Sequence, residues 1–144
     1  MLFSCELEFI KNENCKMNKL IIDAAKDKIF LMIINNESNY SINYENTKIN
    51  YEKLTLLIDG FLKMKNLDLK EISKIYVNRG PGSFAGIRNS LSIVKAFHLT
   101  NNIDYYCFSL EDFDKKIDVK YENIPKLCEK FKVEKNLINP IYLG

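Results

Sequence analysis

The sequence is poor in the residues and runs that build metal sites and membrane spans. It has one histidine, His98, and its cysteines form no C-x-x-C pair, so the donor spacing of a zinc site is missing. Lys, Asn, Asp or Glu interrupts every apolar run well short of the roughly 20 residues of a membrane helix. The first residues also lack the basic start, apolar middle and cleavage site of a secretory signal. These absences predict a cytoplasmic protein without a metal site or membrane association. Its thiols are expected to stay reduced, and they are Cys5, Cys15, Cys107 and Cys128.

Charge is nearly balanced and is spread along the chain. Lys and Arg total 21 and Asp and Glu total 19, which gives a formal net charge of +2. A domain dedicated to nucleic-acid binding usually concentrates its basic residues on one face, so this distribution argues against one. The length of 144 residues and the hydrophobic content of 47% are typical of one compact globular domain.

Three strands are predicted near the start of the domain. Residues 20–22 are apolar and lead through Asp23 into a polar turn, which indicates a buried strand. A second strand is predicted at 29–34. Residues 40–44 alternate between apolar and polar, as a half-exposed strand does. Together these patterns predict a three-stranded meander.

Two amphipathic helices and two further strands complete the predicted order. Apolar residues within 50–65 recur at helical spacing and predict the first helix. A strand at 75–77 runs into a glycine-rich turn, after which helical spacing through His98 predicts the second helix. A strand at 103–108 and a short helix within 123–131 follow. The resulting order, β-β-β-α-β-α-β, predicts an α/β fold with a mixed sheet and flanking helices.

The most informative stretch is the glycine-rich turn RGPGSFAGIR at residues 79–88. Glycine allows backbone conformations closed to other residues and lets other groups approach the main chain closely. Ser83 is placed as an N-cap, and free N–H groups in the first helical turn can bind an anion or a carbonyl. Gly80, Gly82 and Ser83 are therefore candidate contacts to an anion or nucleotide, with Arg88 adding charge. The alternative is a helix cap that only joins strand to helix.

Known catalytic patterns do not fit the chain. The turn lacks the Gly-Lys-Ser/Thr of a P-loop and the glycine spacing of dinucleotide folds. Pro81 and Ala85 stand where a nucleophile elbow needs glycines. The S-x-x-K match that begins at Ser92 lies inside a predicted helix without its companion motifs. His98 lies on an apolar helical face and is interpreted as structural. We expect no catalytic residue and no metal ligand.

The run GPGSFAGIR at residues 80–88 resembles the signature of the TsaB family, which usually reads G-P-G-S-F-T-G-L-R. Only Ala85 and Ile87 differ. Residues 20–23 resemble the opening strand of that family, and 50–58 resemble its first helix. Ser-Leu-Glu at 109–111 and the P-x-Y-L of the chain end also match, so the resemblance runs from about residue 19 to 111 and includes the tail.

The resemblance implies an actin-like (ASKHA, RNase H-like) fold that retains essentially the first lobe. Residues 17–111 would form that lobe and 112–144 a truncated remnant of the second lobe or a tail. Residues 1–16 are interpreted as a loosely attached extension, because Met17 looks like a second chain start.

The resemblance also implies a function in making threonylcarbamoyladenosine (t6A) in tRNA. Members of this family do no chemistry themselves. They bind and activate the homologous catalytic subunit TsaD through helices of the first lobe, the ATPase TsaE joins them, and some form homodimers through the same surface. We therefore expect contact with tRNA only indirectly and no cofactor, with ATP or ADP at most at the interface of the complex. The candidate partner contacts are expected to be exposed, and they are Tyr51, Thr55 and Leu56 on the first helix and Arg88, Leu91, Ser92 and Lys95 on the second.

The chain departs from the family pattern at three places. The usual Asp-Thr-Ser after the first strand is Asp23-Ala24-Ala25, so hydroxyls that could contact a phosphate are missing. The histidine that opens the first helix in the family is Asn50. The segment 112–139 is too short for a full second lobe, which excludes a two-lobed clamp.

The sequence disfavours a peptidase, and two other functions remain as alternatives. A peptidase would require a metal or a nucleophile site, for which the sequence has no H-E-x-x-H pattern and no partnered serine or cysteine. A nucleotide- or anion-binding module would use the glycine turn. A degenerate homodimer would keep the helices as a scaffold after loss of the partner.

Overall fold

A five-stranded mixed sheet forms the centre of the computed structural model, which describes residues 17–36 and 38–142. The strand order is β3-β2-β1-β4-β5. The first three strands pair antiparallel, and β4 and β5 run parallel to β1. The meander and the α/β order are thus confirmed, while the interpretation of residues 1–16 lies outside the described residues. The strands are β1 (Asn18–Asp23), β2 (Lys28–Ile34), β3 (Asn39–Glu45), β4 (Ile72–Asn78) and β5 (Asp104–Phe108).

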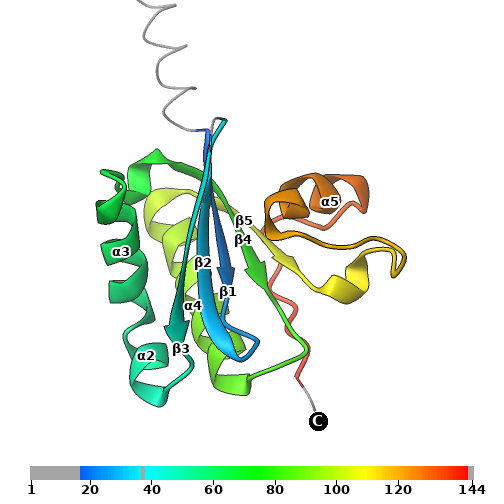
Figure 1. Ribbon diagram of the computed structural model, residues 1–144, viewed down its shortest axis with the longest axis horizontal. Helices are drawn as coiled ribbons and strands as arrows, with labels where there is room; N and C mark the ends of the chain where they lie inside the picture. The colour runs from blue at the N-terminus through cyan, green and yellow to red at the C-terminus, as the bar shows by residue number, and fades with distance from the viewer. Residues whose placement is uncertain (1–16, 37, 143–144) are drawn as a thin grey trace, which may run out of the picture.

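Three helices cover one face of the sheet, here called the helix face (Figure 1). They are α2 (Lys48–Glu52), α3 (Leu54–Met64) and α4 (Phe84–Asn101). The single helix predicted at 50–65 is two helices, because the backbone leaves helical geometry at Lys53 (φ −92°, ψ 8°). The first of them begins earlier than predicted, since Thr47 Oγ1 accepts a hydrogen bond from the Asn50 N–H at 3.1 Å and caps it.

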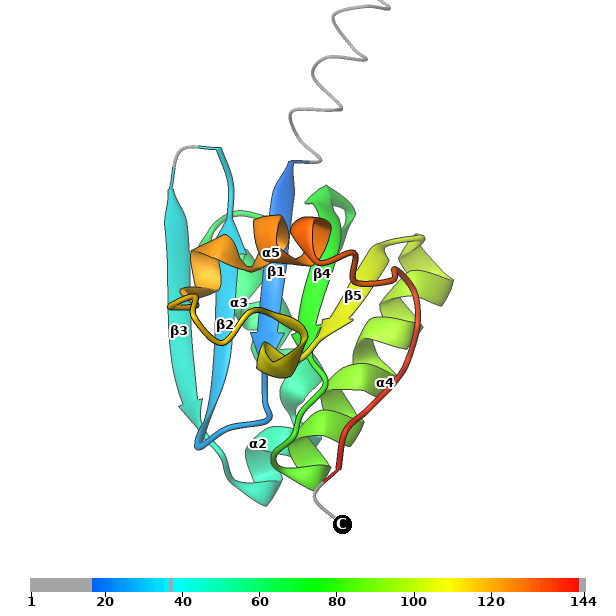
Figure 2. The same ribbon diagram turned by 90° about the vertical axis from the view of Figure 1, so that its right-hand side faces the viewer.

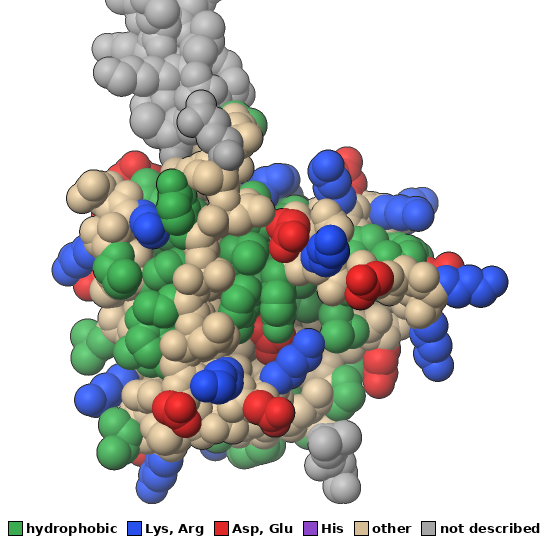
Figure 3. Space-filling model, in the orientation of Figure 1, with side chains coloured by type: hydrophobic (Ala, Val, Ile, Leu, Met, Phe, Trp, Pro, Cys, Tyr) green, Lys and Arg blue, Asp and Glu red, His purple; other side chains and the backbone are tan. Residues whose placement is uncertain are grey.

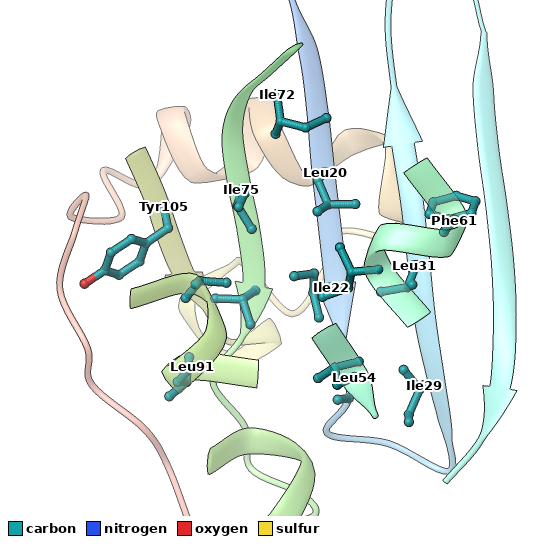
Figure 4. Packing of buried hydrophobic residues seen from close by; sticks show 14 of the residues in the cluster. Leu20, Ile22, Ile29, Leu31, Leu54, Phe61, Ile72, Ile75, Leu91 and Tyr105 are labelled. Carbon is teal, nitrogen blue, oxygen red and sulfur yellow. The ribbon is translucent and has the colours of Figure 1, made fainter. Parts of the chain in front are cut away.

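The core of the helix face is made by alternate residues of the strands and by the inner sides of the helices. Side chains of β1, β2 and β4 point toward α3 and α4 in Figure 4. Those of Leu20, Ile22, Leu31 and Ile75 are completely buried, as is Leu54 of α3. Inward-facing residues recur every two positions in the strands and every three to four positions in the helices. The sequence pattern therefore indicates which residues form this core.

The tail covers the opposite face of the sheet, here called the tail face (Figure 2). It consists of short elements, η2 (Leu110–Asp112), η3 (Tyr121–Asn123) and α5 (Ile124–Lys130), joined by irregular chain. A second core forms there between the sheet and the tail, and it contains Ile21, Met32, Tyr76, Phe108, Phe113, Ile124, Leu127 and Cys128. The short helix predicted within 123–131 is confirmed, with Pro125 in its first turn.

The remaining features of the fold are a short turn before β4, the covered β5 edge and the lengths of the helices. A third short turn, η1 (Leu69–Glu71), leads into β4. The β5 edge is covered by the tail, because the Asn136 N–H donates to the Tyr105 carbonyl at 2.7 Å and the Tyr105 N–H donates to Asn136 Oδ1 at 2.9 Å. Within the described part of the chain, every helix is too short or too polar to cross a bilayer.

Candidate functional site

The glycine turn is packed tightly between two other parts of the chain. A Cβ atom at Gly82 would overlap the carbonyl oxygen of Ala25, and one at Gly86 would overlap that of Ala24. At Gly80, φ is +109°, a region that L side chains rarely adopt, and a Cβ would meet the carbonyl oxygen of Ile141. Close approach of the β1–β2 loop and of the tail therefore explains these glycines.

The hydrogen bonds of the turn are largely internal. Ser83 is the N-cap of α4, as predicted, and its Oγ accepts from the Gly86 N–H at 3.2 Å. The Ser83 N–H donates to the Ala25 carbonyl at 2.8 Å, and the Gly80 N–H donates to Asn78 Oδ1 at 2.9 Å. These donors are therefore already used by the protein. Binding of an anion at Gly80, Gly82 and Ser83 stays a prediction, and the geometry favours the capping alternative.

Arg79 ties the turn to the tail. Its Nη2 lies 2.6 Å and its Nε 3.4 Å from the two carboxylate oxygens of Asp112, and its Nη1 donates to the Asn139 carbonyl at 3.1 Å. The Ile141 N–H donates back to the Arg79 carbonyl at 2.7 Å. The same carboxylate accepts from the Ser109 N–H and closes a capping box. The sequence analysis did not predict the ion pair between Arg79 and Asp112. The Ser-x-x-Asp spacing at 109–112 does predict the capping box.

A second tie joins the end of β1 to the tail. Asp23 is buried, and its carboxylate accepts a hydrogen bond from the Tyr121 hydroxyl at 2.7 Å and from the Ala25 N–H at 3.1 Å. Lys26 Nζ lies 3.9 Å from it. Burial and the neighbouring carboxylate raise the pKa of Tyr121, so its hydroxyl remains a donor. Tyr121 also stacks on Phe30 with ring centroids 4.0 Å apart. The tail thus occupies the space beside the Asp-Ala-Ala loop.

The structure separates the predicted partner contacts into two groups. Tyr51 and Leu91 are 7% and 3% exposed, so the expectation that they form an exposed surface was wrong. Tyr51 turns inward toward the position where α4 begins, and Leu91 faces the sheet (Figure 4). An apolar or aromatic residue at helical spacing packs on its own sheet first. The remaining candidates are exposed on α3 and α4: Thr55, Leu56, Arg88, Ser92 and Lys95.

Large apolar side chains protrude from the helix face. Among the described residues, every large apolar side chain that is more than half exposed lies on α2, α3 or α4: Ile49, Leu56, Met64, Phe84 and Leu99. Hydrophobic side chains protrude at the left of Figure 3, over α2 and α3. Such grouping on neighbouring elements is typical of a protein-binding surface. Helical spacing in the sequence could have predicted this surface, because these apolar residues lie at positions where the polar side of each helix is expected.

The thiols and the histidine of the described residues lie in packed surroundings. Burial raises the pKa of Cys107 to about 12 and that of Cys128 to about 12, so neither is a thiolate at neutral pH. His98 Nδ1 lies 3.0 Å from the Ile103 carbonyl, and its ring packs edge-on against Tyr105. In residues 17–36 and 38–142 there is no cluster of three or more His, Cys, Asp or Glu that could hold a metal.

Comparison with known proteins gives matches that agree with one another. Residues 47–109 match the family model described as TsaD, tRNA N6-adenosine threonylcarbamoyltransferase. The tRNA threonylcarbamoyladenosine biosynthesis protein TsaB of Buchnera aphidicola subsp. Baizongia pistaciae (strain Bp) is 27% identical over 86 residues, which are 60% of this chain and 39% of that protein.

Solved structures show the same fold. YeaZ from Pseudomonas aeruginosa superimposes with a TM-score of 0.59 at 17% identity, over 64% of this chain and 43% of that one. A second structure, of an uncharacterized protein with similarity to peptidase YeaZ from Pseudomonas aeruginosa, gives the same values. The chain therefore spans about two fifths of the length of these relatives.

The relatives found by comparison are consistent with the family resemblance of the glycine turn and with the topology of the sheet. The mixed sheet with flanking helices is the actin-like α/β fold that the resemblance implied. The family model includes the α2-to-β5 region that carries the turn. The chain is thus similar in sequence to TsaB and shares its fold with YeaZ.

Proposed function

We propose that this chain is a non-catalytic subunit of the cytoplasmic machinery that makes threonylcarbamoyladenosine in tRNA, and that it binds a TsaD-like catalytic subunit through the helix face. The observation that carries the proposal is the grouping of the most exposed apolar side chains on α2, α3 and α4. Similarity to TsaB suggests the pathway, because that relative carries this biosynthesis in its name.

The composition of the helix face supports a protein partner. Leu56 and Phe84 are 69% and 57% exposed, and Arg88, Ser92 and Lys95 lie exposed on the same helix as Phe84. An apolar centre with Arg and a polar rim is the usual make-up of an interface between proteins. A TsaE-like ATPase would join through TsaD, and ATP or ADP would bind at most at the interface of the complex.

A non-catalytic role is supported by the chemistry of the turn and the thiols. The Gly80 and Ser83 amides donate within the protein, and Asp23 accepts from Tyr121. Cys107 and Cys128 carry a proton at neutral pH. None of these groups is poised to attack or to protonate a substrate, so the proposed contribution of this subunit is contact with its partner.

Light scattering of a mixture with the TsaD-like protein of the same organism tests the proposal. We expect the mass of a heterodimer, and we expect Leu56→Glu and Arg88→Glu to weaken association at least about tenfold. Leu110→Glu is the matched control, because Leu110 is a partly exposed leucine of η2 on the tail face.

Two outcomes would contradict the proposal. If the two wild-type proteins stay separate at micromolar concentration, the chain is not a TsaD partner, and the mass of the isolated chain then tells whether it is a homodimer. If Leu110→Glu disrupts the heterodimer while Leu56→Glu does not, the partner binds the tail face instead.

A further inference from the structure

Four lysines surround a pocket on the tail face. The pocket has a volume of about 330 Å³ and lies between α5 and the first halves of β1 and β4. Lys19 and Lys74 come from the two strands, Lys126 from the first turn of α5 and Lys132 from the chain that follows α5. Glu129 is the one acidic residue of the lining, so four positive charges and one negative charge leave +3.

Two of these lysines face each other across the sheet. Lys19 and Lys74 are direct partners in the parallel register of β1 and β4, and both are half-buried. Like charges directly opposite on paired strands destabilise a sheet. None of the four lysines has an ion-pair partner among the described residues. Because like charges at this spacing repel each other, a bound anion would reduce the repulsion.

The carboxylate that neighbours Lys74 on β5 forms its polar contacts with the tail. Asp104 is the register partner of Lys74 on β5. Its Oδ1 accepts from Asn136 Nδ2 at 3.0 Å, and its Oδ2 lies 3.8 Å from Lys135 Nζ. The charge of Asp104 is therefore shared with the tail, and it is not among the lining residues.

Two stacked tyrosines also line the pocket. Tyr76 and Tyr106 are register partners on β4 and β5, and their rings stack with centroids 5.1 Å apart. Lys74 Nζ lies 6.0 Å from the centroid of Tyr106. Rigid rings below and mobile lysine heads around the rim form a receptor for a compact anion.

We propose that this pocket binds a phosphate group, carried either by an RNA chain or by a free nucleotide. Lysine binds phosphate as a point charge, and the volume lies within the range of pockets that hold small molecules. The pocket is separate from the glycine turn, because α5 crosses the upper part of β1 and β4 in Figure 2, whereas the turn follows the lower end of β4. The proposal depends on the proposed function only in the choice of tRNA as the first probe.

Fluorescence anisotropy of a labelled tRNA transcript tests the pocket with the full chain. We expect Lys19→Glu/Lys74→Glu to weaken binding at least about tenfold and to make the slope of log affinity against log salt shallower by about 2 between about 50 and about 200 mM salt. The matched control, Lys48→Glu/Lys116→Glu, changes the net charge equally at exposed sites outside the pocket and should bind as the wild type does. Lys126→Glu is a second variant, on the exposed side of α5, in case the strand variant does not fold.

Competition with ATP and with inorganic phosphate identifies the source of the phosphate. Displacement of tRNA by ATP at a concentration that saturates the pocket indicates a nucleotide, whereas displacement by unlabelled RNA alone indicates the RNA backbone. Equal affinity of wild type, pocket variants and control, or no binding of tRNA and ATP to the wild type, would overturn the proposal. Lys126→Glu should still form the heterodimer with the TsaD-like protein, so failure here is distinguishable from failure of the proposed function.

Discussion

The helix face and the tail face of the sheet are covered by different kinds of structure. On the helix face, α3 and α4 are regular helices whose apolar residues recur at constant spacing. On the tail face, short 3-10 turns and the seven-residue α5 are held by contacts between residues far apart in the sequence, such as Tyr121 with Asp23 and Arg79 with Asp112. The core of the helix face therefore depends on regularly spaced apolar residues, and the core of the tail face depends on individual polar and aromatic contacts. We expect the tail face to be the less stable of the two.

A pair of leucine truncations compares the two cores directly. Leu54→Ala on the helix face should lower the free energy of unfolding by about 4 kcal/mol, because Leu54 is completely buried and its cavity cannot collapse. Leu127→Ala on the tail face should cost about 2 kcal/mol, because Leu127 is 8% exposed and lies on the short α5. Urea unfolding measures both values. Equal losses would contradict the difference between the faces.

Gly86 of α4 tests how tightly the helix face is packed. Gly86→Ala should lower the free energy of unfolding by about 3 kcal/mol, because the new Cβ would overlap the Ala24 carbonyl oxygen. Gly60→Ala is the matched control in α3, where nothing lies within 4 Å of the new Cβ, and it should raise stability by up to about 1 kcal/mol. A Gly86→Ala protein as stable as the wild type would show that the loop moves away freely.

The hydroxyl of Tyr121 tests the polar tie of the tail face. Tyr121→Phe keeps the ring that stacks on Phe30 and removes the hydrogen bond to Asp23, so it should cost about 1 kcal/mol. It should also speed proteolysis within residues 113–133. Tyr142→Phe is the control, because Tyr142 is exposed and keeps its ring contact with Phe84. No change in either measurement would mean that stacking alone holds the tail.

Thiol labelling detects opening of the two faces with the smallest perturbation. Cys107 belongs to the core of the helix face and Cys128 to that of the tail face. In a protein with Cys5→Ser and Cys15→Ser, we expect Cys128 to react at least about tenfold faster than Cys107 in urea below the unfolding transition. Equal rates would indicate that the two faces open together.

The same thiols predict a loss of stability in alkali. Burial raises the pKa of each from 9.0 to about 12, so between these values the folded protein keeps protons that the unfolded chain has lost. The free energy of unfolding therefore falls as pH rises from about 9 to about 12 and is unaffected by these groups below that window. We therefore expect the urea concentration at the midpoint of unfolding to fall less steeply with rising pH in Cys107→Ala and in Cys128→Ala than in the wild type. An unchanged decline would assign it to the tyrosines.

Much of the fold could be predicted from local pattern. The strands, the N-cap at Ser83 and the extent of α4 follow from alternation, helical spacing and capping chemistry. The break at Lys53 could not, because neither a glycine nor a proline marks it and the packing of Tyr51 against α4 decides it. The burial of Tyr51 and Leu91 was missed for a related reason, since helical spacing does not tell which side of a wide apolar stripe meets the sheet.

The amino-acid sequence was enough to predict the α/β order, the glycine turn and the resemblance to the TsaB family, because these depend on residues that are neighbours or one helical turn apart. The folded structure was needed to show which faces are buried, that the tail covers the second face, and that Lys19 and Lys74 lie opposite each other. Those features arise from strand register and from contacts such as Tyr121 to Asp23, which are 98 residues apart. No local pattern encodes such pairings, because burial and register are set by the packing of the whole chain.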